Sequence, residues 1–449
     1  MYHISYIFIV YYIIYNNTTL GYIGYPSGTT FNTTAISDIL NRLVDKSTYD
    51  KRLRPKYGAE PVDVGITIHV SSISAVSEVD MDFTLDFYLR QTWQDPRLAF
   101  GDMYYGYQKG KIESLTVGVD YLEKLWKPDT FFPNEKKSFF HTATTHNSFL
   151  RIDPDGTVFT SQRLTVTATC PMKLQLFPMD SQKCKLEIES YGYTIATIHY
   201  HWCQLKDVHC EAAVKVEPFE LTSYRFTSLC INKTIATTSS GSYSRLWAQF
   251  LFEREFSFYM IQIYIPAILV VFISWVSFWI NPESAPSRTV IGTFTILSET
   301  HLLMSTNRRL PPVSYIKAVD VYLGFCYLNV VLALIEYATV TYSRKKYEDE
   351  KKNKSKNIFE LTPQLQAPDL LQDARIDECT CEQDVSVFVV AKPKCPLKCA
   401  TFCKHNRVDL IARIVFPVSF LTFNFIYWTV LLSLSKWRIY GDNAEQRAC

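Results

Sequence analysis

The amino-acid sequence predicts an extracellular all-β sandwich followed by a four-helix transmembrane bundle. The first half alternates polar and apolar residues at period two, as half-buried strands do. The second half holds four apolar segments, each near the roughly 20 residues that a helix needs to cross a bilayer. A dense mixed-charge run separates the third segment from the fourth. The net charge of +2 indicates neither a nucleic-acid partner nor an acidic substrate.

Residues 1–20 are expected to form a signal peptide. Their apolar core, "YIFIVYYIIY", is too short to span a bilayer and has the length of a signal-peptide h-region. It lacks a basic n-region, so an apolar N-terminal tail is the alternative. Four Asn-x-Thr sequons agree with an extracellular first half; they lie at Asn16, Asn17, Asn32 and Asn232.

Residues 40–256 are predicted to form the β-sandwich. The stretch "VDVGITIHVSSISAVSEVDMDFTLDFYLRQTW" alternates at period two, and "SFLRIDPDGTVFTSQRLTVTATC" repeats the pattern around a "DPDG" turn. Many short strands broken by Gly, Pro and Asn are typical of a sandwich. The sequence shows no phosphate loop, no His-Glu-x-x-His and no nucleophile elbow. It therefore indicates no enzyme and calls for no cofactor.

Three transmembrane helices are expected within residues 257–342, and a fourth follows later. Pro266 and Pro417 lie inside the first and fourth, where membrane helices tolerate proline. The run "SRKKYEDEKKNKSK" after the third helix marks the cytoplasmic side, because lysine and arginine beside a span stay inside the cell. An even number of spans returns the tail to the outside. The expected ranges are 258–280, 289–306, 318–342 and 408–435 for the helices, 343–407 for the cytoplasmic loop and 436–449 for the tail.

One cysteine pair carries the most specific motif. Cys170 and Cys184 enclose thirteen residues, "PMKLQLFPMDSQK". In an oxidising compartment a disulfide is plausible there, and closing a loop of ~15 residues stabilises by roughly 3 kcal/mol.

This loop, with "FPMD" at its centre, resembles the Cys-loop pentameric ligand-gated ion channels. The resemblance continues through "WKPDTFF", "EIESYGYT", "YIPAILVVFISWVSFWI", "LPPVSYIKAVDVYLGFC" and "RIVFPVSFLTFNFIYW". It covers Leu40 to Trp437 except the cytoplasmic loop, and is greatest for the anion-conducting branch, with its receptors for GABA, glycine, glutamate and histamine. It implies a pentamer with four other subunits in the plasma membrane of a synapse. It also implies a small amino-acid neurotransmitter as ligand, chloride as the permeant ion, contact with membrane lipid, and no nucleic acid.

The other cysteines leave alternatives open. Relatives of the glycine and glutamate type carry a second disulfide; Cys230 resembles its first half, but Arg245 stands at the partner position. Cys203–Cys210 and Cys210–Cys230 are both open as pairings. On the cytoplasmic side, "CPLKCATFC" could bind zinc if helical, but free thiols or palmitoylation are favoured, so no metal site is assigned.

The second apolar segment is expected to line the pore. Six of its residues recur at spacings of 4, 3, 4, 3 and 4, which puts them on one helical face; they are Val290, Phe294, Leu297, His301, Met304 and Arg308. Bundle core is the alternative, but the resemblance favours the pore. It implies that Leu297 forms an apolar gate. At the cytoplasmic mouth, Pro286 matches the extra proline of anion channels. Ser287 stands where cation channels place glutamate, and Arg288 adds positive charge, as Arg308 does at the outer mouth.

Three pore-helix residues depart from the family pattern. Phe294 replaces the usual threonine and should narrow the pore. His301 would form a ring of imidazoles open to protonation or zinc. Glu299 falls off the pore face and is expected between helices. A non-conducting accessory subunit therefore remains an alternative, and a cation-conducting member is a second one.

The resemblance also places the agonist between subunits. On the principal face it implies Phe131, the second-loop residues Glu189, Ser190 and Tyr191, and Tyr243. Glu189 is expected to hold the ligand ammonium, and an ordinary exposed glutamate is the alternative.

On the complementary face the resemblance implies that Arg90 meets the ligand carboxylate, with Tyr88 and Thr165 beside it. Thr238 stands where GABA-type principal subunits often have an aromatic residue, so a glutamate-, glycine- or other amine-gated channel is the alternative.

Coupling to the pore is implied for Phe177, Pro178 and Asp180 of the Cys170–Cys184 loop. These residues should press on the linker "NRRLPPVSYIK" between the second and third helices.

Overall fold

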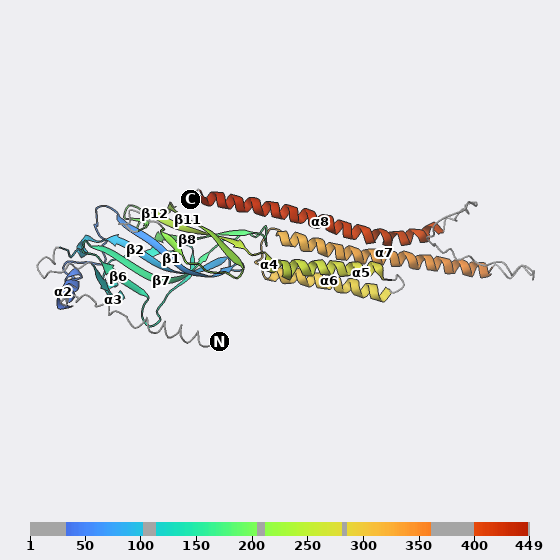
Figure 1. Cartoon of the computed structure of the whole chain (residues 1–449), viewed down its shortest axis with the longest axis horizontal. Helices are drawn as coiled ribbons and strands as arrows, with labels where there is room; N and C mark the ends of the chain where they lie inside the picture. The colour runs from blue at the N-terminus through green and yellow to red at the C-terminus, as the bar shows by residue number, and fades with distance from the viewer. Residues whose placement is uncertain (1–32, 102–113, 204–211, 281–284, 361–398, 448–449) are drawn as a thin grey trace, which may run out of the picture.

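The computed structural model describes residues 33–101, 114–203, 212–280, 285–360 and 399–447. A β domain lies at one end of an elongated molecule and a bundle of long helices at the other (Figure 1). The predicted fold class, a β-sandwich followed by a helical bundle, is confirmed.

The larger sheet is built around one long hairpin. β1 (Val62–Ser77) pairs antiparallel with β2 (Asp82–Gln94), and alternate side chains of both strands are buried. Among the described residues this sheet has eight strands in the order β10-β1-β2-β7-β6-β3, with β9 beside β1 and β5 beside β7. The other strands are β3 (Leu115–Val117), β5 (Glu135–Phe140), β6 (Ser148–Ile152), β7 (Thr157–Thr169), β9 (Ile198–Trp202) and β10 (Val214–Val216).

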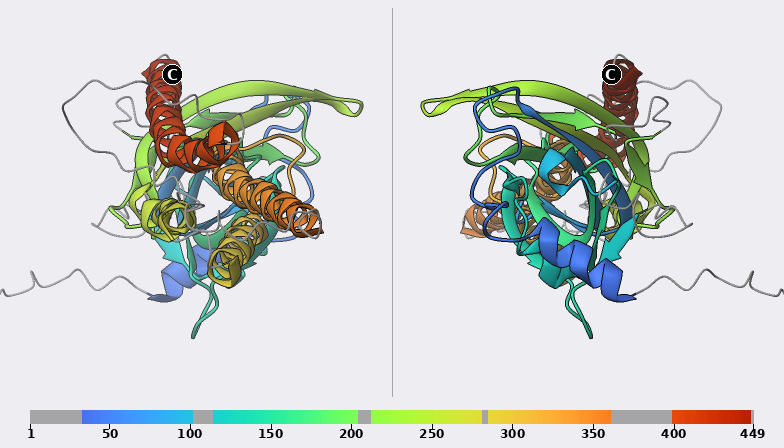
Figure 2. Two further views of the ribbon diagram at one scale, coloured as in Figure 1. Left: turned by 90° about the vertical axis from the view of Figure 1, so that its right-hand side faces the viewer. Right: turned by 90° about the vertical axis from the view of Figure 1, so that its left-hand side faces the viewer.

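The smaller sheet covers the inner face of the larger one. Its four described strands follow the order β11-β12-β8-β4. Phe83 of the larger sheet packs on Phe250 and Phe252 of the smaller, with ring centroids 6.1 and 6.4 Å apart. Figure 2 shows the long β11–β12 hairpin arching across one side of the sandwich. The strands are β4 (Thr130–Phe131), β8 (Ser181–Ser190), β11 (Tyr224–Thr238) and β12 (Gly241–Arg254).

Two local features confirm sequence predictions. The "DPDG" turn is closed by a bond from the Asp153 N–H to the Thr157 carbonyl. Gly156 there has φ +82°, and a Cβ at this position would lie 2.4 Å from the Asp95 carbonyl oxygen, so glycine is required. The Cys170–Cys184 disulfide forms, and it joins the end of β7 to β8 across the two sheets.

Short helices complete the β domain. They are α2 (Thr33–Leu43), η1 (Pro96–Leu98) and α3 (Val119–Leu122). The Tyr121 hydroxyl donates to the Leu40 carbonyl at 2.7 Å, so α2 and α3 are tied together.

The helical part begins with one continuous helical segment, residues 257–279. It runs through α4 (Ser257–Tyr259), η2 (Met260–Tyr264), α5 (Ile265–Val276) and η3 (Ser277–Trp279). The turn before Pro266 is a π-helix, a local adjustment that accommodates proline in membrane helices. α6 (Ala285–Arg308), α7 (Ala318–Glu360) and α8 (Cys399–Arg447) follow.

Two helices extend beyond the predicted spans. α7 continues past residue 342 to Glu360, and α8 continues past residue 435 to Arg447. The charged run after the third span is rich in lysine and glutamate, which are good helix formers, and Arg344 pairs with Glu348 one turn on at 3.3 Å. The helix therefore continues where the apolar segment ends.

Aromatic side chains hold the bundle together. Tyr264 is fully buried, with its ring 4.8 Å from Tyr322 of α7 and 4.9 Å from Trp428 of α8. Its hydroxyl lies 2.9 Å from that of Tyr427. Among the described residues three helices are long and apolar enough to cross a membrane, Ser257–Trp279, Ala318–Asn353 and Leu410–Gly441. α6 is more polar than these three.

Some sequence predictions lie outside the described residues. They are the signal peptide, Asn16, Asn17, Asn32, Cys210 and the side chains of the cytoplasmic cysteines. Asn232 lies exposed on β11. Cys203 and Cys230 are each disulfide-bonded, as expected of extracellular cysteines.

Candidate functional site

The principal-face residues gather where β4 meets β8. Phe131 stands opposite Glu189 in this short antiparallel pairing. Tyr191 comes directly after β8, and its ring meets the Phe131 ring edge to face, with centroids 5.4 Å apart. Tyr191 is 75% exposed, so this aromatic pair presents a surface that a ligand ammonium could approach.

Ser190 is buried behind that surface. Its hydroxyl donates to the Asp129 carboxylate and accepts from the Tyr193 N–H at 3.0 Å. The Gly192 N–H donates to the same carboxylate at 2.6 Å. Ser190 and Asp129 therefore fix the loop that carries Tyr191, and Asp129 is a positioning residue that the sequence analysis missed.

Glu189 already has a cationic partner in the chain itself. Its Oε2 lies 2.5 Å from Nε of Arg245, whose Nη1 lies 3.0 Å from Glu187. The Glu189 side chain is 5% exposed. Neither the burial nor the partner follows from the sequence, in which Arg245 stands where relatives place a cysteine. The adjacent strands β8 and β12 bring the three residues together.

Tyr243 lies near the tip of the β11–β12 hairpin. It is buried, and its hydroxyl lies 2.9 Å from the Ser240 hydroxyl. The hairpin is tied to the segment after Tyr191 by a bond of 2.8 Å from the Ile195 N–H to the Ser242 carbonyl. Gly241 has φ +145°, and a Cβ there would lie 2.9 Å from Thr194, so glycine permits this approach.

The complementary-face residues lie on the larger sheet. Tyr88 and Arg90 alternate with buried residues along β2, so both point to the outer face. Thr165 is nearly buried on β7, and its hydroxyl lies 2.8 Å from Nε2 of His141. The structure thus places Tyr88 and Arg90 on one sheet face, with Thr165 on the adjacent strand.

Two ionic residues beside Tyr88 were missed in the sequence. Arg163, directly opposite Tyr88 in the β2–β7 register, binds Asp86 with Nη2 2.6 Å from Oδ2. Its guanidinium carbon lies 6.0 Å from the Tyr88 ring centroid. By contrast, no carboxylate among the described residues pairs with Arg90. The predicted contact of Arg90 with a ligand carboxylate stays a prediction, and the fork geometry of a guanidinium suits it.

The residues predicted to line a pore form an exposed stripe on α6. Val290, Phe294, Leu297 and Met304 are 51, 65, 64 and 57% exposed in the chain. His301 and Arg308 continue the stripe, and Pro286 and Ser287 are exposed at its start. Thr295, Glu299 and Thr306 are buried on other faces of the helix; the expected position of Glu299 off the stripe is confirmed.

Arg288 departs from the expected position. Its side chain is 1% exposed, its Nε donates to the Ile280 carbonyl at 3.0 Å, and its guanidinium lies 5.7 Å from the Tyr337 ring centroid. It sits two residues before Val290, about 200° around the helix, and so faces the end of the first span and α7 rather than the stripe. Arg288 thus lies at the N-terminal end of α6 with its side chain away from the stripe, and its role in anion selection stays a prediction.

Comparison with known proteins identifies both parts of the chain. Residues 36–256 match the model of the neurotransmitter-gated ion-channel ligand binding domain, and residues 263–372 match that of the transmembrane region of the same channels. The chain belongs to the neurotransmitter-gated ion-channel family. It is similar to the gamma-aminobutyric acid receptor subunit alpha-2 of Homo sapiens, Bos taurus and Mus musculus, at 38% identity over 421 residues that cover 90% of each chain.

In this ion channel the disulfide loop touches the helical bundle as expected. The Leu174 N–H donates to the Tyr315 hydroxyl at 2.9 Å, and the Ala318 N–H donates to the Gln175 carbonyl at 2.9 Å. Tyr315 lies in the linker between α6 and α7. Phe177 and Pro178 are buried beside this contact.

A buried arginine joins the loop to the channel's first membrane helix. Arg254, at the end of β12, binds Asp180 with Nε 2.7 Å from Oδ1 and also binds Glu78. It donates to the hydroxyls of Tyr224 and Tyr259 at 2.5 and 3.0 Å. This hub links β1–β2, the disulfide loop, β11 and α4, and the sequence analysis missed it.

Burial and charge set the ionisation of this hub. Burial is the largest single effect and acts to lower the pKa of the Arg254 guanidinium, but Asp180, Tyr224 and Tyr259 together outweigh it and raise the pKa. Burial also raises the pKa of the Tyr224 hydroxyl well above its usual value. Arg254 is therefore charged and Tyr224 neutral throughout the physiological pH range.

Proposed function

We propose that the chain is a subunit of a chloride channel gated by γ-aminobutyric acid (GABA). The observation that carries the proposal is the 38% identity to a GABA receptor subunit over 90% of both chains. The site chemistry supports it. A zwitterionic amino acid needs an aromatic and acidic surface for its ammonium and an arginine for its carboxylate. Phe131 and Tyr191 supply the aromatic surface, with the buried, Arg245-paired Glu189 opposite Phe131, and Arg90 supplies the arginine.

The agonist binds between neighbouring subunits. The principal residues belong to the smaller sheet and its loops, whereas Tyr88, Arg90 and Thr165 belong to the larger sheet. One chain offers both faces, so five copies could form a homopentamer, and other subunits could complete a heteropentamer. Such a channel acts in the plasma membrane at the postsynaptic side.

The pore conducts anions. Five copies of the α6 stripe line it, Leu297 forms the apolar gate, and Ser287 leaves the cytoplasmic mouth without a carboxylate ring. Glu299 is withdrawn into the bundle. Positive potential comes from the α6 N-termini, from Arg308 at the outer mouth, and from Arg288 behind the stripe.

The proposed membrane topology keeps the ranges expected from the sequence. Residues 40–256 lie outside the cell after removal of 1–20. The bilayer contains 258–280, 289–306, 318–342 and 408–435, leaving 343–407 in the cytoplasm and 436–449 outside. The position of Arg438 supports this topology, because it lines one cavity with Lys183 and Gln182 of the β domain.

The test is expression of the chain alone in oocytes. GABA, glutamate, glycine and histamine are applied in turn, and the reversal potential is measured at several chloride concentrations. We expect GABA-evoked current whose reversal follows chloride. A reversal potential independent of chloride concentration would refute the anion pore. Current evoked only by an agonist other than GABA would refute GABA as the ligand.

A non-conducting accessory subunit is a second candidate. The observation that favours it is Phe294, a large ring on the exposed stripe where a small residue suits permeation. This role predicts silence to every agonist when the chain is expressed alone, and altered currents when it is expressed with a conducting relative.

A further inference from the structure

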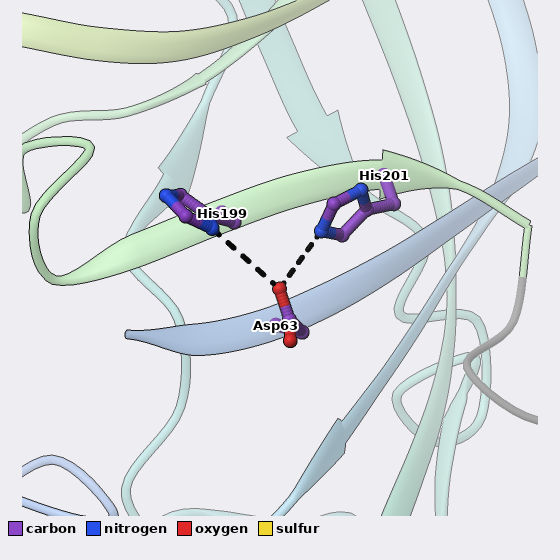
Figure 3. Close-up of side chains that lie close together, drawn as sticks. All are labelled: Asp63, His199 and His201. Atoms are coloured by element: carbon purple, nitrogen blue, oxygen red, sulfur yellow. Dashed lines mark hydrogen bonds and ion pairs between the residues drawn. The ribbon is translucent and has the colours of Figure 1, made fainter. Parts of the chain in front are cut away.

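Two histidines and an aspartate meet on the outer surface of the β domain. His199 and His201 come from β9, and Asp63 comes from β1 (Figure 3). Oδ1 of Asp63 lies 3.7 Å from Nδ1 of His199 and 2.8 Å from Nε2 of His201. In the part of the chain that the structure describes, this is the one group of at least three His, Cys, Asp or Glu side chains whose donor atoms all lie within 4.8 Å of one another.

Strand geometry fixes the arrangement. His199 and His201 are two residues apart, so both point outward while Tyr200 between them is fully buried. The Tyr200 hydroxyl bonds to Thr130 at 2.8 Å, which anchors the strand. In the parallel β1–β9 register Asp63 stands beside His199, and Gly65 stands beside His201. Because Gly65 has no side chain, the Asp63 carboxylate can reach diagonally to His201.

The donor set suits a borderline divalent transition metal. Two imidazoles and one carboxylate are a set that holds Zn²⁺ with a fourth position left for water. Tetrahedral bonds of about 2.0–2.1 Å put ligand atoms about 3.3 Å apart. The present separations of 2.8 and 3.7 Å bracket that value, so only small side-chain movements are needed.

We propose that Asp63, His199 and His201 form an extracellular binding site for Zn²⁺ or a similar transition-metal ion. None of the three residues belongs to the proposed ligand faces or to the α6 stripe, and the proposal does not depend on which agonist opens the channel. Hard cations such as Mg²⁺ and Ca²⁺ are excluded, because they prefer oxygen-only ligand sets.

One neighbouring cation opposes metal binding. Nζ of Lys233 on β11 lies 3.5 Å from Nδ1 of His201. Lys233 is exposed, so it can turn away when a dication binds. Removing the Lys233 charge should therefore strengthen metal binding. If the cluster were only a surface ion pair between Asp63 and the histidines, no metal affinity would be expected.

The experiment measures Zn²⁺ affinity of the purified full-length channel, prepared without a polyhistidine tag, by competition with a fluorescent zinc chelator. D63N, H199Q and H201Q should each lower the affinity at least about tenfold, since loss of a ligand costs no less than loss of its supporting partner. K233A should raise it. The matched control is H69Q. His69 lies on β1, the strand that carries Asp63, and pairs with only one carboxylate, Glu217, at 2.6 Å.

Unchanged Zn²⁺ affinity in H199Q and H201Q would overturn the proposal, as would an equal loss in H69Q. Competition by MgCl₂ at similar concentration would also overturn it. H201C guards against a folding artefact, because a thiolate can replace the imidazole as a zinc ligand and should retain binding. Size-exclusion profiles of all variants establish that the pentamer is intact.

Discussion

The pairing of Glu189 with Arg245 is the residue-scale feature that most shapes the ligand site. Both side chains lie on facing strands of the smaller sheet, and Glu187 completes a carboxylate–guanidinium–carboxylate row. The buried Glu189 is the member nearest the exposed aromatic pair, because it stands opposite Phe131. Glu189 and Glu187 therefore differ in their distance from the aromatic pair, and substituting each in turn distinguishes their roles in agonist binding.

Glu189→Gln should raise the agonist concentration that gives half-maximal current. A hydrogen bond to a charged group contributes about 1.5–3 kcal/mol, which corresponds to roughly 10- to 150-fold. The measurement is a concentration–response curve in oocytes, with Glu187→Gln as the control. A larger shift in Glu187→Gln than in Glu189→Gln would contradict the assigned role.

Arg90→Lys should weaken agonist binding nearly as much as Arg90→Ala. A lysine keeps the charge but loses the planar fork that binds a carboxylate through two parallel bonds. The comparison of the two concentration–response curves checks this. Wild-type sensitivity in Arg90→Lys would show that charge alone is needed at this position.

Phe294→Thr should increase the single-channel conductance. The Phe294 ring is 65% exposed on the α6 stripe, so a smaller side chain widens that level of the pore. Single-channel recording measures the change, with Phe294→Leu as a control of intermediate size. Equal conductance in all three channels would place this side chain outside the ion path.

Periodicity predicted residue positions on α6 well. It separated the exposed stripe from Glu299, which is buried. The same periodicity places Arg288 off the stripe, about 200° around the helix from Val290. Partners such as Asp86–Arg163 could not be predicted, because they depend on the register between strands far apart in sequence.

At the scale of elements, the Arg254 hub connects the ligand-binding domain to the first membrane helix. The Arg254 and Asp180 side chains have no solvent exposure. The hub lies where four segments converge, and the adjoining disulfide loop bonds to the α6–α7 linker. β12 therefore connects the β11–β12 hairpin directly to the bundle.

Asp180→Asn should destabilise the channel, because it leaves the Arg254 charge buried with fewer compensating carboxylates. Breaking a buried ion pair costs about 3–5 kcal/mol. Thermal unfolding of purified channel measures the loss, and the double variant Asp180→Asn/Arg254→Gln should recover part of it. Additive losses in the double variant would mean that the two side chains do not interact.

Strand alternation predicted the elements of the β domain, but hydropathy underestimated the lengths of two helices, α7 and α8. Hydropathy marks the part of a helix that crosses the bilayer. The whole length of the helix also depends on helix-forming residues outside the bilayer. This explains why α7 and α8 continue into charged sequence. The smaller sheet joins β4 and β8 to a distant hairpin, and such long-range pairing follows from no local pattern.

At the scale of the whole molecule, the chain presents surfaces that neighbouring subunits of a pentamer would complete. The α6 stripe is exposed although it is partly apolar, and α6 is the helix that does not meet the criterion for a membrane span by hydropathy. In the end-on view the other helices do not enclose it (Figure 2). A mixed stripe of this kind suits contact with water in a central channel better than contact with lipid.

The Glu189–Arg245 pair also changes what an agonist affinity means for this molecule. In the proposed role of Glu189, the agonist ammonium would meet no empty anionic site; it would compete with a guanidinium already held at 2.5 Å. The measured affinity is then the free-energy difference between two cations exchanging at one carboxylate. In that proposal, releasing Arg245 from Glu189 would lower the net agonist affinity even where every contact to the agonist is good.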